Sequence, residues 1–158
     1  MRIRGMAIHT LLRKQRVKGD LAEIWCFFSN PRNLSKITPK EMGFEILSDL
    51  PEKMFPGMMI EYRVRPLFGI PMSWLTEITH VVDGVYFVDE QRIGPYAVWH
   101  HEHHFAPLEN GEIEMVDRIT YVPPLGILGE IIHPFLIRPQ LEKIFAHREV
   151  AVRERFGI

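Results

Sequence analysis

The segment GPYAVWHHEHHF, residues 94–105, holds four of the chain's eight histidines within five residues. Its β-branched and aromatic residues follow a Gly-Pro turn, which predicts a β-strand. Alternate side chains of a strand point to opposite faces, so one face should carry Trp99, His101, His103 and Phe105. That face joins aromatic surface to two imidazoles. Ligand pockets have this composition, because their walls are largely apolar with a few placed polar groups.

Further segments with a two-residue period indicate an antiparallel sheet. Short turn sequences such as Asp83-Gly84 and Gly94-Pro95 separate them, and turns this short join strands that run in opposite directions. After a first strand at 7–17, in which Ile8, Thr10 and Leu12 alternate, the expected strands lie at 44–47, 58–64, 72–82, 86–91, 97–107 and 111–122.

Helical periodicity appears on both sides of these strands. Asp20 precedes an apolar stripe of Leu21, Ile24, Trp25 and Phe28, and is expected to cap a short helix, with a second short helix starting at Pro31. The C-terminal segment predicts a long helix, most regular over 140–156, that Pro134 and Pro139 kink or divide. Polar side chains including Arg148 are expected to form the outer, polar face of that helix.

This order of elements predicts an α+β domain over residues 1–158. A curved antiparallel sheet of about six or seven strands should wrap around the long C-terminal helix, with two short helices after the first strand. The space between the sheet and the helix is where a cavity would form. The predicted fold is therefore a curved antiparallel sheet packed around one long helix.

Composition excludes several other classes of protein. Hydrophobic residues make up 46% of the chain and charged residues 25%, values typical of a globular domain rather than a disordered or fibrous one. The formal charge of −1 provides no net field for nucleic acid, so we expect no nucleic-acid partner. From the hydropathy of the sequence we expect no integral membrane segment and no signal peptide. The single cysteine, Cys26, cannot form an internal disulfide, and we expect a cytoplasmic protein in which this thiol is buried or half-buried.

The order of elements and a set of motifs resemble the START-like superfamily, also called SRPBCC or Bet v 1-like. Within it the chain is similar to the bacterial ligand-binding SRPBCC branch that is sometimes labelled cell division inhibitor. The resemblance covers about 7–156 and rests on Asn33-Leu34, Ile37-Thr38-Pro39, Trp74, Phe87, Asp89, Gln91, Gly94-Pro95-Tyr96, Trp99, His101, His103, Phe105, Asp117-Arg118-Ile119-Thr120-Tyr121, Pro124-Leu125-Gly126, Arg138, Gln140-Leu141 and Ile144-Phe145.

The resemblance implies a helix-grip fold with a deep pocket. Members of the superfamily bind sterols, lipids, quinones, polyketides or plant hormones, and some are enzymes, including aromatase/cyclases and the catalytic domains of ring-hydroxylating oxygenases. Fold analogy alone does not choose among these activities. It implies no cofactor for this branch.

Alternation along neighbouring strands selects the candidate ligand-binding residues. Aromatic side chains would form the apolar wall and polar ones would recognise ligand groups: Tyr62, Trp74, Thr76, Asp89, Gln91, Trp99, His101, His103, Phe105, Asp117 and Tyr121. A carboxylate beside a histidine favours the imidazolium and fixes its tautomer, so we expect Asp117 to meet His101 or His103. A buried polar network without ligand contact explains the same residues equally well.

Metal binding and nucleophilic catalysis have less support in the sequence. His101 and His103 could present two imidazoles to one ion, with Asp117 or Glu102 as further ligands, but Glu102 points to the opposite face of the strand. Two correctly directed ligands are too few, so we expect no metal. Cys26 lies in an apolar stretch without the positive surroundings of a reactive thiol.

These observations predict non-catalytic binding of a hydrophobic or amphipathic small molecule, such as a lipid, quinone or polyketide-like compound, in an internal cavity. The alternative is a polyketide cyclase/dehydratase-like enzyme in which His101 or His103 moves a proton and Asp117 orients it. A third interpretation is a carrier that meets a membrane through the apolar loop near Phe68. Segments 54–58 and 66–71 are unusually apolar for loops, which suggests a pocket entrance or a homodimer contact.

Overall fold

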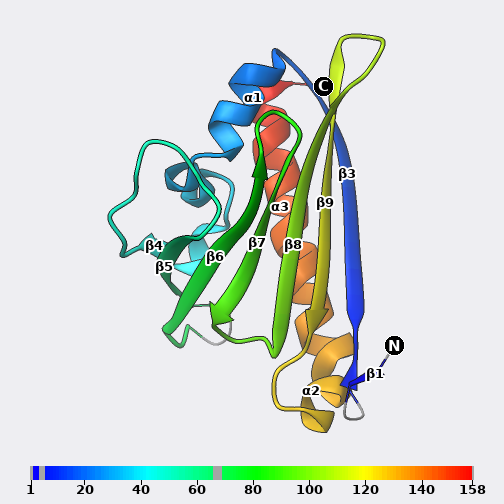
Figure 1. Cartoon of the computed structure of the whole chain (residues 1–158). Helices are drawn as coiled ribbons and strands as arrows, with labels where there is room; N and C mark the ends of the chain where they lie inside the picture. Colours follow the sequence, from blue (N-terminus) through cyan, green and yellow to red (C-terminus); the bar gives the residue numbers. More distant parts are fainter. Residues whose placement is uncertain (1, 4–5, 66–68, 158) are drawn as a thin grey trace.

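A seven-stranded antiparallel sheet forms the body of the computed structural model, which describes residues 2–3, 6–65 and 69–157 (Figure 1). The strands occur in the order β3-β9-β8-β7-β6-β5-β4. A separate short hairpin, β1 and β2, precedes them. The bounds are β1 Arg2–Ile3, β2 Met6–Ala7, β3 His9–Lys18, β4 Glu45–Ile46, β5 Met58–Val64, β6 Met72–Val82, β7 Tyr86–Ile93, β8 Val98–Pro107 and β9 Glu112–Val122.

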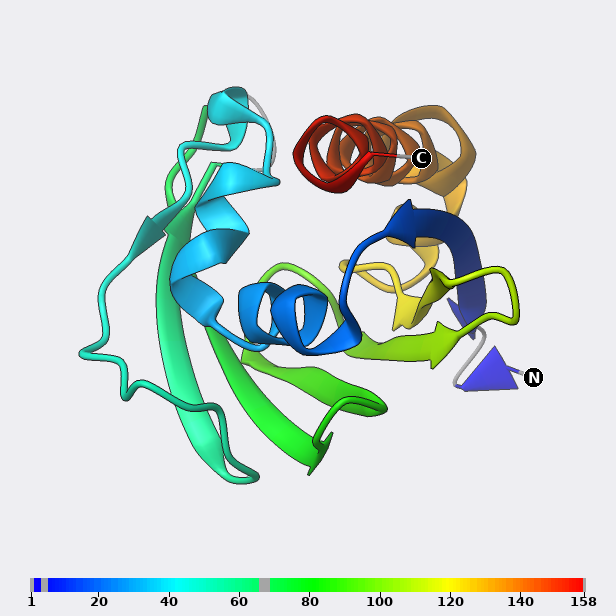
Figure 2. The ribbon, with the colours of Figure 1, turned by 90° about the horizontal axis from the view of Figure 1, so that it is seen from above.

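The sheet curves around the C-terminal helix, as the sequence predicted. Seen from above, the strands form an arc, helix α3 lies across its open side, and α1 lies within the arc (Figure 2). Short helices follow β3, and three helical segments follow β9. Their bounds are α1 Leu21–Phe28, η1 Pro31–Lys36, η2 Lys40–Met42, α2 Ile127–Ile132, η3 His133–Ile137 and α3 Arg138–Phe156.

The C-terminal helical region is divided near its two prolines, as the sequence predicted. Pro134 lies in η3, a wider turn of π type between α2 and α3, and Pro139 lies in the first turn of α3. Proline lacks the N–H that an inner helical position would donate, so these breaks have a local cause. Within the described part of the chain, no helix is both long and apolar enough to cross a bilayer.

Helix α1 is capped as expected and packs with its expected apolar stripe, of which Ile24 and Phe28 are buried and Leu21 and Trp25 half-buried. The Asp20 carboxylate accepts hydrogen bonds from the backbone N–H groups of the first turn, at 2.7 Å from Ala22 and 3.3 Å from Glu23. The buried side chains are Ile24, Phe27 and Phe28. The expectation of a buried or half-buried Cys26 is wrong, because the helix turns that thiol to solvent.

The inward face of β3 also differs from the expected alternation. Leu11 and Val17 are buried, whereas Thr10 and Leu12 are exposed. The cause is the register with β9, which places Leu11 opposite the fully buried Ile119. A one-residue change of register moves every side chain to the other face, and the adjacent leucines of this strand left the choice open.

Candidate functional site

The concave face of the sheet, the segment from α1 to η2, and α3 enclose a cavity of about 180 Å³. A water molecule needs roughly 10 to 15 Å³ by the same measure, so the cavity has room for about a dozen. Its wall is mostly apolar and includes Leu34, Ile60, Val64, Trp74, Trp99 and Ile144. Apolar clusters fill the interior on either side of this space.

Three adjacent strands bring two aspartates and two histidines together at one place in the wall. Strand β7 provides Asp89, β8 provides His101 and His103, and β9 provides Asp117. Asp89 pairs across the strands with His101, and Asp117 with His103. Strand β8 stays in unbroken register with β9 from end to end, so the alternation of β8 is preserved. His101 and His103 are both only 5% exposed.

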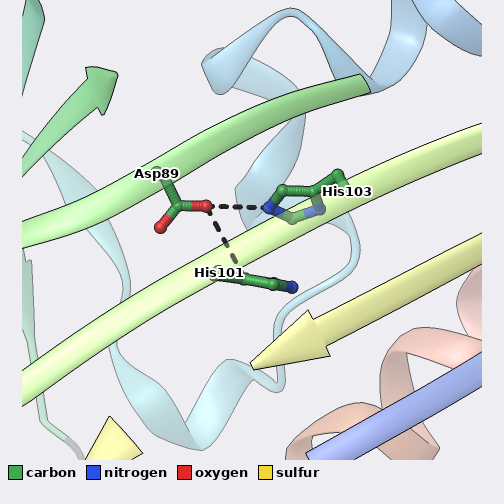
Figure 3. Close-up of side chains that lie close together, drawn as sticks. All are labelled: Asp89, His101 and His103. Atoms are coloured by element: carbon green, nitrogen blue, oxygen red, sulfur yellow. Dashed lines mark hydrogen bonds and ion pairs between the residues drawn. The ribbon is translucent and has the colours of Figure 1, made fainter. Parts of the chain in front are cut away.

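Each aspartate contacts both imidazole rings. Asp89 Oδ2 lies 2.8 Å from His103 Nε2 and 3.6 Å from His101 Nδ1 (Figure 3). On the other side, Asp117 Oδ1 lies 3.0 Å from His101 Nε2 and 2.9 Å from His103 Nδ1. The ring centroids of the two histidines are 3.7 Å apart. The predicted meeting of Asp117 with a histidine is therefore observed for both rings.

Arg148 completes this group from α3, and its place corrects the expected polar face of that helix. The side chain points inward, and its Nη2 lies 3.2 Å from Asp117 Oδ1. Arg148 follows Leu141 and Phe145 on the buried face of α3. The helical spacing of this face gave a signal for its position, but a single arginine among many charged neighbours does not reveal that it is paired.

Electrostatics within the group fixes its charges. Burial would raise the pKa of Asp117, but the Arg148 guanidinium and the imidazoles outweigh burial and hold this pKa well below its usual range. The pKa of Asp89 is lowered in the same way, since its contacts with the histidines and Arg148 outweigh desolvation. Both carboxylates are therefore ionised.

The two histidines differ in how readily they take up a proton. Burial lowers the pKa of His103, but hydrogen bonds to Asp117 and Asp89 outweigh it and raise this pKa above its ordinary value. Desolvation, together with the neighbouring charge on His103, lowers the pKa of His101 to about 4. Of the two rings, His103 is therefore the one that the group prefers to protonate.

The candidate ligand-binding residues divide into two sets. Those in the cavity wall are Tyr62, Trp74, Thr76, Asp89, Trp99, His101 and His103. The second set lies outside the cavity wall. In this set, Asp117 contacts the histidines from behind, and Phe105 packs in the apolar cluster near α1. Gln91 bonds to the backbone of Tyr96, and the Tyr121 hydroxyl bonds to His133 at 2.8 Å.

Several cavity residues were not foreseen. Besides Arg148 they include Phe28, Leu34 and Met42 from the region between β3 and β4, and Tyr96 from the turn before β8. The short helices after β3 showed apolar residues but gave no indication of which would face the sheet. Met54, from one of the two apolar loops, also lines the cavity. Phe68 lies outside the described residues.

Metal-ligating atoms converge at one point of the wall. Asp89, His101 and His103 each offer one such atom, and these lie within 4.8 Å of one another. The sequence had offered Asp117 or Glu102 as further ligands beside the two histidines, and it predicted no metal. Asp117 is on the far side of the rings, and Glu102 lies on the outer face beside His104, at 2.8 Å. The third atom comes instead from Asp89.

Several solved structures are similar to this chain over nearly its whole length. Protein Ms6760 from Mycobacterium smegmatis is similar over 92% of both chains, at 15% identity and a TM-score of 0.65. Norcoclaurine synthase from Thalictrum flavum matches over 96% of this chain and 87% of its own, at 14% identity and a TM-score of 0.67. Ara h 8.0201 matches over 94% and 99%, at 13% identity and a TM-score of 0.58.

The chain has the Bet v 1-like helix-grip fold. The expectation drawn from the motifs is thereby confirmed for the architecture. No family model matches the sequence, and no curated protein matches it. At identities of 13 to 15% the similarity concerns the helix-grip fold alone, so the function has to be argued from the cavity.

Proposed function

We propose that this protein binds a hydrophobic or amphipathic small molecule in the cavity of its helix-grip fold. The observation that carries the proposal is a largely apolar wall in which two imidazoles, a carboxylate and a guanidinium lie together at one place, from His101, His103, Asp89 and Arg148. Specific ligand sites combine apolar surface with a few converging polar groups. A filled protein core would leave no space of this size.

The polar group of the wall gives the ligand an orientation. An apolar body would lie against side chains such as Trp74 and Ile144, while a hydroxyl, carbonyl or carboxylate would meet the histidines. Lipids, quinones and polyketide-like compounds have this division between an apolar body and a polar end. Norcoclaurine synthase and Ara h 8.0201 share the fold, and the fold supports the proposal only as an analogy.

Native mass spectrometry of the protein purified from its own cells, with extraction of bound compounds, tests for a natural ligand. In a parallel test, the fluorescent probe anilinonaphthalene sulfonate should bind in a one-to-one ratio. Leu34→Trp, which fills the cavity, should abolish probe binding, whereas Leu12→Trp on the exposed face of β3 should not. Equal binding by both variants would show that the probe occupies another surface and would contradict the proposal.

A second candidate function is acid–base catalysis on a bound polyketide-like molecule. It is favoured by the position of His101 and His103 in the cavity wall with carboxylates that orient them. General acid–base catalysis contributes roughly 10²- to 10⁴-fold in rate. In an enzyme, His103→Gln should abolish turnover of the extracted compound while leaving its binding measurable. In a binding protein the same variant changes affinity only.

A further inference from the structure

The atoms facing Asp89 have the arrangement of a three-ligand metal site. Asp89 Oδ2 lies 2.8 Å from His103 Nε2 and 3.6 Å from His101 Nδ1, and the ligand atoms of the three residues lie within 4.8 Å of one another (Figure 3). All three residues belong to the cavity wall. An ion among these atoms would therefore be bound beside the cavity.

Asp117 gives the second, independent indication. Its Oδ1 lies 3.0 Å from His101 Nε2 and 2.9 Å from His103 Nδ1, which are the ring nitrogens on the side away from Asp89. When both nitrogens donate to Asp117, the remaining nitrogen of each ring faces Asp89. Metal-bound histidines characteristically donate their second N–H to a carboxylate, which fixes the tautomer and the ring orientation. Arg148 in turn holds Asp117 in place.

We propose that Asp89, His101 and His103 bind one divalent transition-metal ion. Two imidazoles and one carboxylate suit zinc, iron, cobalt or nickel, whereas calcium and magnesium prefer oxygen ligands alone. Three protein ligands leave a coordination position open, and all three residues line the cavity. Any proton held between His103 Nε2 and Asp89 Oδ2, which lie 2.8 Å apart, leaves to solvent when the ion binds.

The charge of the group then indicates which cavity ligand suits the bound ion. With the ion bound, the carboxylates of Asp89 and Asp117 are opposed by Arg148 and the dication, and the two imidazole rings, which bind a metal in their neutral form, add no charge. One positive charge is then in excess in a poorly solvated place. A hydroxide ion, or an anionic oxygen such as a carboxylate at the end of an apolar molecule, compensates that charge. The metal site thus goes beyond binding by apolar contact, and it does not depend on such binding.

The test uses the full chain, first treated with a chelator and then titrated with Zn²⁺ or Co²⁺ in a calorimeter. We expect one ion per chain. Asp89→Asn and His101→Gln should each weaken binding by more than the roughly 10- to 100-fold that loss of an outer carboxylate usually costs. Asp117→Asn should fall within that range. The matched control is His104→Gln, on the outer face of the same strand beside Glu102.

A measurement on the unaltered protein makes the test independent of variant stability. In a nitrogen NMR spectrum of the zinc-loaded protein, His101 Nδ1 and His103 Nε2 should show the shifts of metal-bound nitrogens, and their other nitrogens should stay protonated. The proposal is wrong if Zn²⁺ leaves both rings unshifted. It is equally wrong if His104→Gln abolishes binding while Asp89→Asn does not, since the ion would then lie on the outer face.

Discussion

The buried contact between Arg148 and Asp117 should make a large contribution to stability that can be measured by removing its cation. We consider Arg148→Met, because methionine is similar in length and as suited to a helix as arginine. The two side chains are only 8% and 14% exposed. Removing one partner of a buried ion pair typically costs about 3 to 5 kcal/mol, because the remaining charge is left uncompensated.

Asp117 keeps two imidazole contacts in this variant, so we expect the lower part of that range, about 3 kcal/mol. In a domain of this size 1 kcal/mol corresponds to roughly 2 to 4 °C, which gives a Tm lower by about 6 to 12 °C. Urea unfolding with a chelator present measures the free energy without any metal contribution. The matched control is Arg153→Met, whose 3.2 Å contact with Glu149 is exposed on the same helix and should cost less than about 0.5 kcal/mol.

A double-mutant cycle separates the pair from general damage to the helix. Asp117→Asn removes the charge that Arg148→Met leaves behind, so the double variant should be more stable than the two separate losses predict, by about 1 to 3 kcal/mol. If the two losses simply add, or if Arg148→Met costs no more than Arg153→Met, the pair is not an energetic link between α3 and the sheet.

Three further predictions concern other parts of the fold. Asp20→Ala should lower the free energy of unfolding by about 1 kcal/mol because α1 loses its cap, whereas Asp83→Ala in a turn should not; urea unfolding compares them. Ile119→Ala, at a position with no exposure, should lower the free energy of unfolding by about 2 to 5 kcal/mol. A smaller loss would mean that the sheet closes around the space left by the removed atoms. Burial and the neighbouring His9 lower the pKa of His133, so the unfolded chain takes up a proton below about pH 6.5 that the folded chain resists. Stability should fall as the pH drops through about 6.5, and His133→Gln should reduce that slope; an unchanged slope would contradict this assignment.

The regular parts of the fold could be predicted because their signals are local. The two-residue period and the short turns gave the sheet, and the alternation of β8 placed Trp99, His101 and His103 on the inner face. The contact of Asp117 with a histidine followed from the same alternation in β9, and the structure extends it to both rings.

What the sequence left open depends on contacts between distant segments. The inner face of β3 is set by its pairing with β9, where Leu11 meets Ile119. In the sequence, Arg148 is one of many charged residues of a polar helix. Only the packing of that helix on the sheet shows that it pairs with Asp117. Asp89 was expected to contact a ligand, but its convergence with His101 and His103 depends on the pairing of β7 with β8.

The inward arginine of α3 also bears on how a molecule reaches the cavity. If α3 swung away from the sheet, the guanidinium and the Asp117 carboxylate would part inside an apolar interior, at a cost of several kcal/mol. This cost makes thermal separation of α3 from the sheet infrequent. The opposite side of the cavity, residues 31–42, is held by the packing of Leu34 and Ile37 and by hydrogen bonds such as those from Arg32 to the carbonyl oxygens of Leu50 and Pro51, and the described residues show no buried ion pair there. A ligand should therefore enter and leave the cavity beneath residues 31–42, while α3 stays in place.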